Sequence, residues 1–421
     1  MKAKKNTHTN GAGVSSSASK GRGSEPDLWE FVPLSGYEVP AQTTGKAADN
    51  AWSSFKRIFM PMEEASLSGA GENELPHLPQ TRLQQLVPSP DWSSAAAALD
   101  GALQEWTAVP EPDRPVQFLI GQPYNGHAEI IRHWAGRHRA ELIASPAYEQ
   151  ILAGNLRWFD NWPSSGQLWV LPNLEHCYLR HAHGLKLIRQ LLARAESGQL
   201  GRGLIGCDSW AWAYLQRIWP VPRPDALTLQ AFDGPRLARF LAAMANPPTA
   251  RRRIRFRNAA NGSDILVVPL ENDQVRSEFH QLAAHCRGNL GIAVQYWRKR
   301  LRAAPAEEKS GKMEKTATEQ PGSPDEEWVW VTNMLPEPAL PSGEDEDFSQ
   351  TLHALMLHAG LPASILPQLL PLPPHRCMAL LFRLRNAVLA HSCDGRWSVP
   401  GLACASVRSL LRSRDYLIDS F

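Results

Sequence analysis

Five short apolar segments, separated by segments with helical periodicity, constrain the fold of this chain more than any other feature. The apolar segments span residues 116–120, 140–143, 168–171, 203–207 and 226–229. Helices are predicted between them over residues 128–139, 147–152, 185–195 and 210–219, with one more over residues 93–106. Short buried strands that alternate with helices are what a parallel sheet with crossover helices requires. The sequence therefore predicts a doubly wound α/β core.

Composition limits the classes of protein to which the chain can belong. Its 421 residues suffice for two or three domains of ordinary size. With 44 basic and 42 acidic side chains, the net charge of +2 gives no global field that would attract nucleic acid or anionic lipid. No run approaches the roughly 18 apolar residues of a membrane span, and the N-terminal residues lack the apolar stretch of a signal peptide. We therefore expect a cytoplasmic protein without a membrane span.

Six parts are predicted along the chain from shifts in composition and pattern. Residues 1–25 are expected to be a disordered tail, because they contain almost nothing apolar to offset the entropy of ordering. Residues 26–90 are expected to form an irregular N-terminal arm. The α/β core is predicted over residues 91–230, a helical lid over 231–302, and a linker over 303–345. Residues 346–421 form a separate C-terminal unit.

A glycine-containing loop follows the first predicted strand. It is the stretch Gly121, Gln122, Pro123, Tyr124, Asn125, Gly126, His127 and Ala128. The spacing of its glycines resembles the P-loop pattern GxxxxGK[ST], in which backbone N–H groups and a helix N-terminus hold phosphate. Two substitutions alter the chemistry. His127 stands in place of the phosphate-binding lysine and is expected to be mostly neutral at pH 7, and Ala128 stands in place of the hydroxyl that binds magnesium.

The third predicted strand departs from the same pattern. Pro172 occupies the position of the acidic residue that would hold a metal and orient water. Asn173 and Glu175 are the nearest Walker B-like side chains, but Glu175 is expected to lie about three residues too late. Phosphoryl transfer depends on a lysine, a hydroxyl and this acid for charge stabilisation. We therefore predict no catalytic residues, weak binding of ATP or ADP, and no bound metal. Glycine turns between strand and helix also occur in α/β folds that bind no phosphate.

In the order of its elements, the stretch from residue 91 to residue 302 resembles the AAA+ family of P-loop ATPases. The resemblance implies that Asp208 and Ser209, after the fourth strand, occupy the sensor position. It also implies that Arg217 or Arg223 occupies the position of the arginine finger, which in this family reaches a neighbouring subunit. Residues 288–293 resemble the lid motif of the origin-recognition and STAND branches, although the sensor arginine is absent from it.

The C-terminal unit resembles a winged helix, which origin-recognition ATPases also carry after their lid. Its pattern is three helices, a hairpin with Asp394 and Gly395 at the turn, and a final helix. Between residues 348 and 421 it contains seven Arg, no Lys and three Asp, which permits contact with DNA backbone. The candidate DNA contacts are Arg376, Arg383 and Arg396.

Two other clusters of functional side chains have simpler explanations. Arg251, Arg252, Arg253, Arg255 and Arg257 alternate with apolar residues, which indicates the exposed face of a strand in the lid. Cys177 and His181 are of metal-ligand type, but four zinc ligands from so short a segment would require an improbable chain path.

The leading prediction is a pseudo-ATPase that acts as a regulatory or scaffold protein and assembles with itself or with another protein. The 15 tryptophans favour an interface, because aromatic residues are enriched where proteins bury contact area. Two alternatives stay open: a weak ATPase with a divergent P-loop, and a DNA-binding accessory factor.

Overall fold

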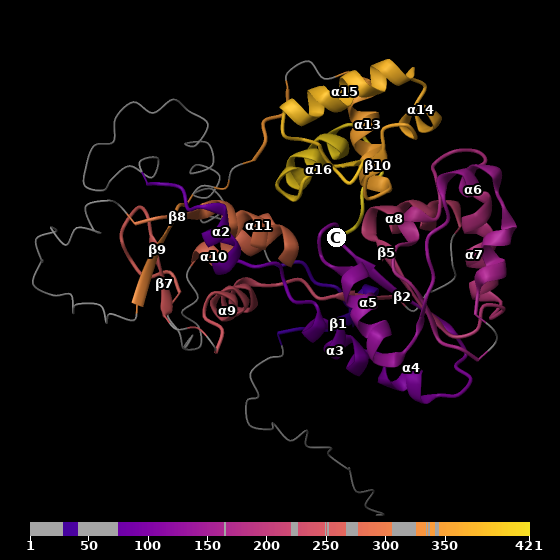
Figure 1. Cartoon of the computed structure of the whole chain (residues 1–421), viewed down its shortest axis with the longest axis horizontal. Helices are drawn as coiled ribbons and strands as arrows, with labels where there is room; N and C mark the ends of the chain where they lie inside the picture. The colour runs from indigo at the N-terminus through magenta and orange to yellow at the C-terminus, as the bar shows by residue number, and fades with distance from the viewer. Residues whose placement is uncertain are drawn as a thin grey trace, which may run out of the picture.

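The computed structural model describes residues 28–40, 75–163, 166–219, 226–248, 250, 252–266, 277–304, 326–333, 335, 337–341 and 345–421. Three parts are visible in Figure 1. The body comprises residues 91–229 together with the strand β1 (Phe31–Pro33). The lid comprises residues 231–304 and 326–333. The C-terminal unit comprises residues 345–421 and lies above the body in the view shown. The predicted tail and most of the predicted linker lie outside the described residues.

The body is built on a six-stranded sheet in the order β1-β6-β2-β5-β4-β3. Its remaining strands are β2 (Val116–Gly121), β3 (Glu141–Leu142), β4 (Trp169–Leu171), β5 (Gly203–Asp208) and β6 (Ala226–Leu229). These five strands are parallel, as predicted, and β1 pairs antiparallel with β6. Counted from β2, the parallel order is 5-1-4-3-2. The loops that follow β2, β5 and β4 therefore emerge side by side at one edge of the sheet, where ligands bind in open α/β sheets.

Alternate residues of each strand face opposite layers of helices. Phe118, Trp169 and Ile205 pack on one face with α7 (Lys186–Glu196), α8 (Ser209–Ile218) and side chains of the C-terminal unit. Leu119, Val170 and Leu204 pack on the other face with α3 (Ser93–Ala102) and α5 (His127–His138) and with side chains of the lid. Strands buried on both faces explain why these segments read as continuous apolar runs. The short helix α6 (Tyr148–Ala153) contributes the buried Ile151 to the first of these two faces.

The N-terminal part of the chain is more regular than predicted. The arm contributes β1 to the main sheet, the turn η1 (Leu34–Gly36) and the helix α2 (Gln80–Leu86). Trp29 packs against Trp92 and Phe232, with ring centroids 5.8 Å and 5.6 Å apart, so the described residues of the arm around Trp29 belong to the core. Residues 41–74 of the predicted arm lie outside the described residues. The single helix predicted over residues 93–106 is divided at Leu103 into α3 and α4 (Gln104–Ala108).

The lid is mixed α/β rather than helical as predicted. Its helices are α9 (Gly234–Ala245), α10 (Ser277–His285) and α11 (Leu290–Arg300). They pack against a sheet of β7 (Arg253–Asn258), β9 (Glu326–Val331) and β8 (Leu301–Arg302), in that order. Because β9 pairs in parallel with β7, part of the predicted linker belongs to the lid. Phe256 and Val329 lie opposite each other and are buried, so pairing over a long sequence separation decided this sheet.

The C-terminal unit combines helices with a small sheet. Its helices are α13 (Glu346–Leu357), α14 (Leu366–Leu369), α15 (Pro374–Asn386) and α16 (Cys404–Ser413), the last preceded by the turn η4 (Gly401–Ala403). Its strands are β10 (Leu361–Pro362), β11 (His391–Cys393) and β12 (Arg396–Ser398), with β12 in the middle. The β11–β12 turn has Asp394 at φ 50° and Gly395 at φ 75°, as a type I′ hairpin turn requires.

The C-terminal unit also packs directly on the body. The Tyr178 hydroxyl donates to the Leu357 carbonyl at 2.9 Å, and the last residue, Phe421, packs against Tyr37 with ring centroids 4.7 Å apart. The C-terminus consequently lies between the two parts in Figure 1. Among the described residues, no helix is long and apolar enough to cross a membrane.

Candidate functional site

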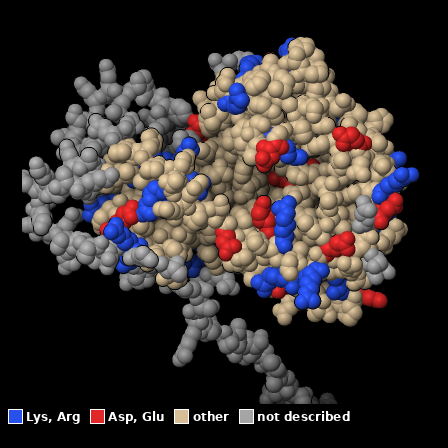
Figure 2. Space-filling model, viewed as in Figure 1, with Lys and Arg blue, Asp and Glu red and all other residues tan. Residues whose placement is uncertain are grey.

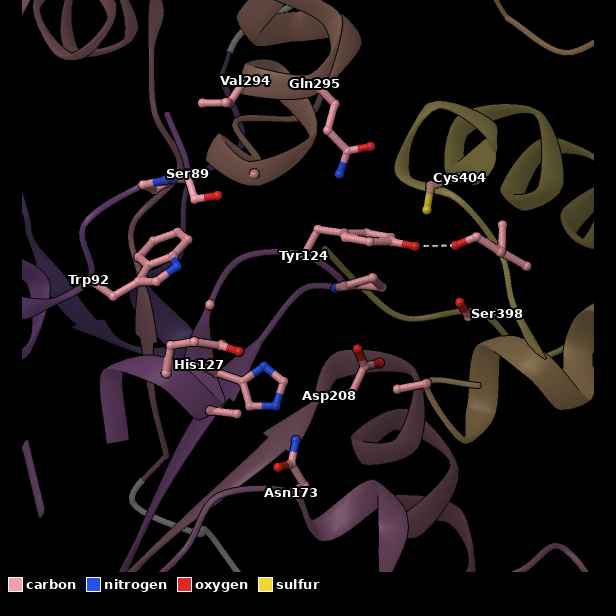
Figure 3. Close-up of a pocket in the computed structure, with 18 of the residues that line it drawn as sticks. Ser89, Trp92, Tyr124, His127, Asn173, Asp208, Val294, Gln295, Ser398 and Cys404 are labelled. Atoms are coloured by element: carbon pink, nitrogen blue, oxygen red, sulfur yellow. Dashed lines mark hydrogen bonds between the residues drawn. The ribbon is translucent and has the colours of Figure 1, made fainter. Parts of the chain in front are cut away.

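A cavity of about 730 Å³ lies at the edge of the main sheet where the body, the lid and the C-terminal unit meet (Figure 3). The body contributes Trp92, the glycine loop, and the segments that follow β4 and β5. The lid contributes Gly291, Val294, Gln295 and Arg298 from α11. The C-terminal unit contributes a wall of side chains: Leu355, Met356, Ala359, Ser398, Val399 and Cys404.

The glycine loop keeps the local geometry that a phosphate-binding loop needs. The Asn125 N–H donates to the Gln122 carbonyl at 3.0 Å, and Gly126 adopts φ 71°, which a residue with a side chain rarely does. A Cβ on Gly126 would also lie 2.3 Å from the Trp92 ring. Helix α5 then begins at His127 without a side-chain cap, and Gly126, His127 and Ala128 all line the cavity. Backbone N–H groups at such a helix start favour an anion.

The lid motif predicted at residues 288–293 packs directly on this loop. The Asn289 side chain donates to the Pro123 carbonyl at 2.8 Å, and the Leu290 N–H donates to Asn125 Oδ1 at 3.3 Å. A Cβ on Gly291 would lie 1.8 Å from the Tyr124 carbonyl oxygen, so only glycine permits this approach. The loop is therefore held in place by the lid as well as by its own turn.

Tyr124 joins the loop to the C-terminal unit. It adopts φ 66°, a left-handed conformation that is unusual for a bulky residue and is maintained by its surroundings. Its hydroxyl donates to the Val399 carbonyl, so the ring crosses the cavity in Figure 3. No local sequence signal indicates this contact of Tyr124, because it depends on Val399, 275 residues away.

His127 and Glu175 form a buried pair beneath the loop. His127 Nε2 lies 3.3 Å from Glu175 Oε1, and the two side chains are 11 % and 1 % exposed. Burial alone would lower the pKa of His127, but the Glu175 carboxylate reverses the shift and raises it. Burial alone would raise the pKa of Glu175, but His127 lowers it to about 2. The Glu175 carboxylate therefore favours the charged form of His127, which the expectation of a mostly neutral ring did not take into account.

Glu175 lines the cavity although it follows the expected position of the acidic residue by about three residues. Directly after β4 the chain forms the 3-10 turn η3 (Leu174–His176), which returns Glu175 to the cavity. Glu175 Oε1 accepts the Asn173 side-chain N–H at 2.8 Å, and Oε2 accepts the Asp208 backbone N–H at 3.0 Å. Arg132 in turn donates to Asn173 Oδ1 at 2.9 Å. Both Walker B-like candidates thus lie at the site, although Pro172 occupies the strand position.

The two sensor candidates have different surroundings. Asp208 lines the cavity, is 1 % exposed, and caps α8 by accepting the Trp210 N–H at 2.9 Å. Its pKa is raised well above its ordinary value, first by burial and then by the Glu175 carboxylate. Ser209 instead donates to the Asp419 carboxylate, which also pairs with Arg408. Ser209 thus contacts the C-terminal tail rather than the cavity.

Of the arginines singled out from the sequence as finger or DNA contacts, none that the structure describes lines the cavity. Arg217 is exposed at the end of α8, and Arg223 lies outside the described residues. Arg376 pairs with Asp347 at 2.7 Å. Arg383 Nη1 lies 3.9 Å from Asp345 Oδ2.

Arg396 is used inside the molecule. Its guanidinium donates to the Tyr148 hydroxyl and to the Gly360 carbonyl, both at 2.6 Å. It therefore links the hairpin of the C-terminal unit to α6 of the body. A DNA contact by Arg396 would compete with both hydrogen bonds.

The remaining clusters behave as structural features. Burial raises the pKa of the Cys177 thiol, and the described residues contain no group of three or more side chains that could hold a metal ion. Arg255 pairs with Asp264 and, at 3.3 Å, with Glu326, while the guanidinium of Arg257 lies 3.8 Å above the Trp328 ring. Arg251 lies outside the described residues.

On the face drawn in Figure 2, acidic and basic side chains of the described residues are interspersed over the body.

Comparison with known proteins gives limited information. No protein-family model and no curated protein matches the chain. Among solved structures, the Thermotoga maritima RuvB Holliday junction branch migration motor is 13 % identical, covering 80 % of this chain and 100 % of RuvB, with a TM-score of 0.30. The Walker-type ATPase PABY2304 of Pyrococcus abyssi is 12 % identical, covering 80 % of this chain and 98 % of that one, with a TM-score of 0.31. Cdc6p from Pyrobaculum aerophilum is 10 % identical, covering 77 % and 95 %, with a TM-score of 0.29. Similarity at this level assigns no activity, ligand or partner to this chain.

Proposed function

We propose that this chain is a pseudo-ATPase of AAA+ type that acts as a regulatory or scaffold module and assembles with itself or with a protein partner. The observation that carries the proposal is the buried His127–Glu175 pair. The single cationic side chain of the glycine loop already has a carboxylate partner at 3.3 Å, instead of being available to a phosphate.

Several features of the body support an AAA+ origin. The parallel order 5-1-4-3-2 agrees with the AAA+ resemblance of the sequence. The glycine loop lies between the first strand of that order and a helix, and the lid packs on the loop through Asn289 and Gly291. The order of the helices and the hairpin in the C-terminal unit supports a winged helix.

Electrostatics at the site argue against hydrolysis. Phosphoryl transfer needs positive charge around the terminal phosphates and a metal ion to neutralise the developing charge. Here Glu175 and Asp208 line the cavity beside the loop, and Ala128 offers no hydroxyl to a metal. A triphosphate would therefore meet two carboxyl groups beside the loop, and among the described residues Arg298 of the lid is the only guanidinium that lines the cavity. ATP or ADP would bind weakly, through the N–H groups of the first turn of α5.

One observation favours a weak ATPase as the second candidate. Glu175 is a buried carboxylate at the edge of the sheet beside the loop, so a water molecule could be oriented there despite Pro172. Steady-state phosphate release from the purified full-length chain separates the two candidates. A pseudo-ATPase gives only background release, and the Glu175→Gln variant gives the same. So does the control Glu129→Gln, which removes an exposed carboxylate on α5. Release above background that is lost in Glu175→Gln but kept in Glu129→Gln would establish the weak ATPase instead.

Nucleotide binding is tested by thermal shift. We expect a small shift with millimolar ATP or ADP, with little dependence on magnesium, and no shift would mean that the loop holds no nucleotide. His127→Lys together with Ala128→Thr should enlarge the shift by ATP, because these changes restore a cation and a hydroxyl ligand. An unchanged shift in the double variant would show that the loop is not a phosphate site.

Assembly is the other half of the proposal. Phe382 on α15 and Val388, two residues after its end, are 42 % and 60 % exposed, which favours contact with protein over contact with DNA. Light scattering at micromolar concentration should detect an oligomer or a complex, weakened by the Arg217→Ala, Arg223→Ala double variant. A strict monomer from which pull-down recovers no partner would remove the scaffold function.

A further inference from the structure

Three side chains on and just after α15 are open to solvent although two of them are apolar. Phe382, Arg385 and Val388 are all exposed, whereas Leu381 and Leu384 between them are buried in the C-terminal unit. The helix thus has a core face and an outer face. In Figure 1 α15 forms the outer edge of the C-terminal unit, away from the body and the lid. We call Phe382, Arg385 and Val388 the α15 patch.

Val388 has a backbone conformation that its side chain disfavours. It follows α15 at φ 59°, in the left-handed region, where a β-branched residue is a rare exception. The end of the helix requires this conformation. The Val388 N–H donates to the Arg385 carbonyl at 3.0 Å, and the Leu389 N–H donates to the Leu384 carbonyl at 2.8 Å. Glycine or asparagine is the usual residue at such a position. A valine that is both strained and exposed gives the fold little, which indicates a contact outside the chain.

Phe382 and Arg385 form one continuous surface. The Arg385 guanidinium lies 4.9 Å from the centroid of the Phe382 ring. On its other side the Phe382 ring is perpendicular to the ring of Trp397 on β12, with centroids 6.0 Å apart. The patch therefore rests on the hairpin as well as on the helix. Aromatic and arginine side chains dominate the binding energy of many protein interfaces.

The charge of the patch is unbalanced. Arg376 and Arg383 on the same helix have carboxylates beside them, from Asp347 at 2.7 Å and from Asp345 at 3.9 Å. Among the described residues, no carboxylate pairs with Arg385. A partner with an acid at this point would complete an ion pair without breaking an existing one. Two copies of the patch face to face would bring two Arg385 groups together with no acid in either patch, which disfavours a symmetric dimer through this surface.

We propose that the α15 patch docks an acidic amphipathic segment of a partner protein. Apolar side chains of that segment pack on Phe382 and Val388, and an Asp or Glu beside them pairs with Arg385. At 1.5 Å per residue the patch spans about 9 Å, which is comparable to the distance between positions i and i+7 of a partner helix. DNA would offer phosphate to Arg385 but leave the two apolar side chains without a matching surface. This inference rests on the proposed function, because it names the chemistry of the protein partner that assembly requires.

The test begins with selection of random peptides, displayed on phage, against the immobilised full-length chain. We expect the enriched peptides to carry Asp or Glu next to Leu, Ile, Phe or Trp. The most enriched peptide is then synthesised and titrated against the full-length chain by fluorescence anisotropy. Phe382→Ala and Arg385→Glu should each weaken its binding at least about tenfold, because removal of a central aromatic or arginine side chain from an interface commonly has an effect of this size.

A charge exchange shows whether Arg385 contacts the acids of the peptide. The Arg385→Glu variant with a peptide in which lysines replace the acids should bind to within about threefold of the original pair, because the ion pair is formed again with its charges exchanged. Arg412→Glu is the matched control. It changes another exposed arginine of the C-terminal unit, on α16, by the same charge and should leave binding of the original peptide unchanged.

Val388→Asn separates a role in docking from a role in the fold. Asparagine tolerates the left-handed conformation, so the melting temperature should be unchanged or higher. Peptide binding should nevertheless weaken, because one of the two apolar contacts is lost. A lower melting temperature with unchanged peptide binding would show that Val388 serves the fold alone and would overturn its place in the patch.

Peptides that bind Phe382→Ala and Arg385→Glu as tightly as the wild type would overturn the inference, and so would the absence of any enriched peptide. Binding of duplex DNA that is lost in Arg385→Glu would assign the helix to nucleic acid instead. A dimer that is lost in Phe382→Ala would make a second copy the occupant. Failure of the proposed function is distinguishable, because phosphate release and the recovery of any partner decide it. A partner recovered equally well with Phe382→Ala would keep the scaffold function and remove only the patch.

Discussion

The loop site and the contact between the body and the C-terminal unit both bury histidines, but with opposite consequences for charge. At the loop, burial lowers the pKa of His127, yet Glu175 outweighs burial and the net pKa is raised. At the contact, burial and Arg180 lower the pKa of His353 to about 4 and that of His358 to about 3. His358 Nε2 accepts the Arg180 backbone N–H at 3.4 Å, and no carboxylate pairs with it among the described residues.

The difference shows that a partner, rather than burial, decides whether a buried histidine carries charge. The Glu175 carboxylate, in the turn after β4, favours the charged form of His127 and at the same time pairs with it. The contact with the C-terminal unit, by comparison, uses neutral rings as packing and hydrogen-bonding groups.

The largest effect is expected from Glu175→Gln, which removes that carboxylate. Without the carboxylate, burial returns the His127 ring to its neutral form. The ring and the N–H groups that Glu175 accepts then lose their ionic partner, which should cost up to about 3 kcal/mol of unfolding free energy. Chemical denaturation measures the loss. The His127→Gln, Glu175→Gln double variant should recover part of it, because two amide side chains can pair with each other. A double variant no more stable than Glu175→Gln would contradict this explanation.

The next effect concerns His358 and acid. The unfolded His358 takes up a proton below about 6.5, whereas the folded ring stays neutral down to about 3, so its contribution to stability falls as pH drops through 6.5. Between pH 7 and pH 5 the loss amounts to about 2 kcal/mol, at 1.36 kcal/mol per unit. His358→Gln should lose correspondingly less stability over this interval than the wild type. The exposed His375 makes a matched control, because His375→Gln should leave the pH dependence unchanged.

His127 should show the reverse pH dependence. Because its folded pKa is raised, its contribution to stability is complete below about 6.5 and is lost as pH rises through the folded value. The stability difference between the wild type and His127→Gln should therefore shrink as pH rises above neutrality. Thermal unfolding across pH 6–9 measures it. A difference that grows with pH would mean that Glu175 does not control the ring.

The smallest effect is expected from Tyr124→Phe, at the hydrogen bond that joins the loop to the C-terminal unit. The variant removes the donor to the Val399 carbonyl, which should cost about 1 kcal/mol. Because the charges of both histidine groups are unchanged, neither pH dependence should alter. An altered pH dependence in Tyr124→Phe would show that the two regions are coupled through this tyrosine.

The sequence by itself determined the elements whose signals are local. The apolar strands, the helices between them, the glycine loop and the hairpin at Asp394 and Gly395 follow from periodicity and turn chemistry over a few residues. Glu175 could be named as the nearest carboxylate, and Asp208 as a polar residue after a strand, because both follow apolar runs.

Only the tertiary structure decided the pairings and charges that join distant segments. β9 pairs with β7 across about 70 residues, and β1 pairs with β6 across about 200, because burial of a shared face selects partners that sequence spacing does not encode. The return of Glu175 to the cavity depends on the turn η3, and the charge of His127 depends on that carboxylate. The raised pKa of Asp208 likewise depends on burial by distant segments and on Glu175, because the energy of a charge depends on every group around it.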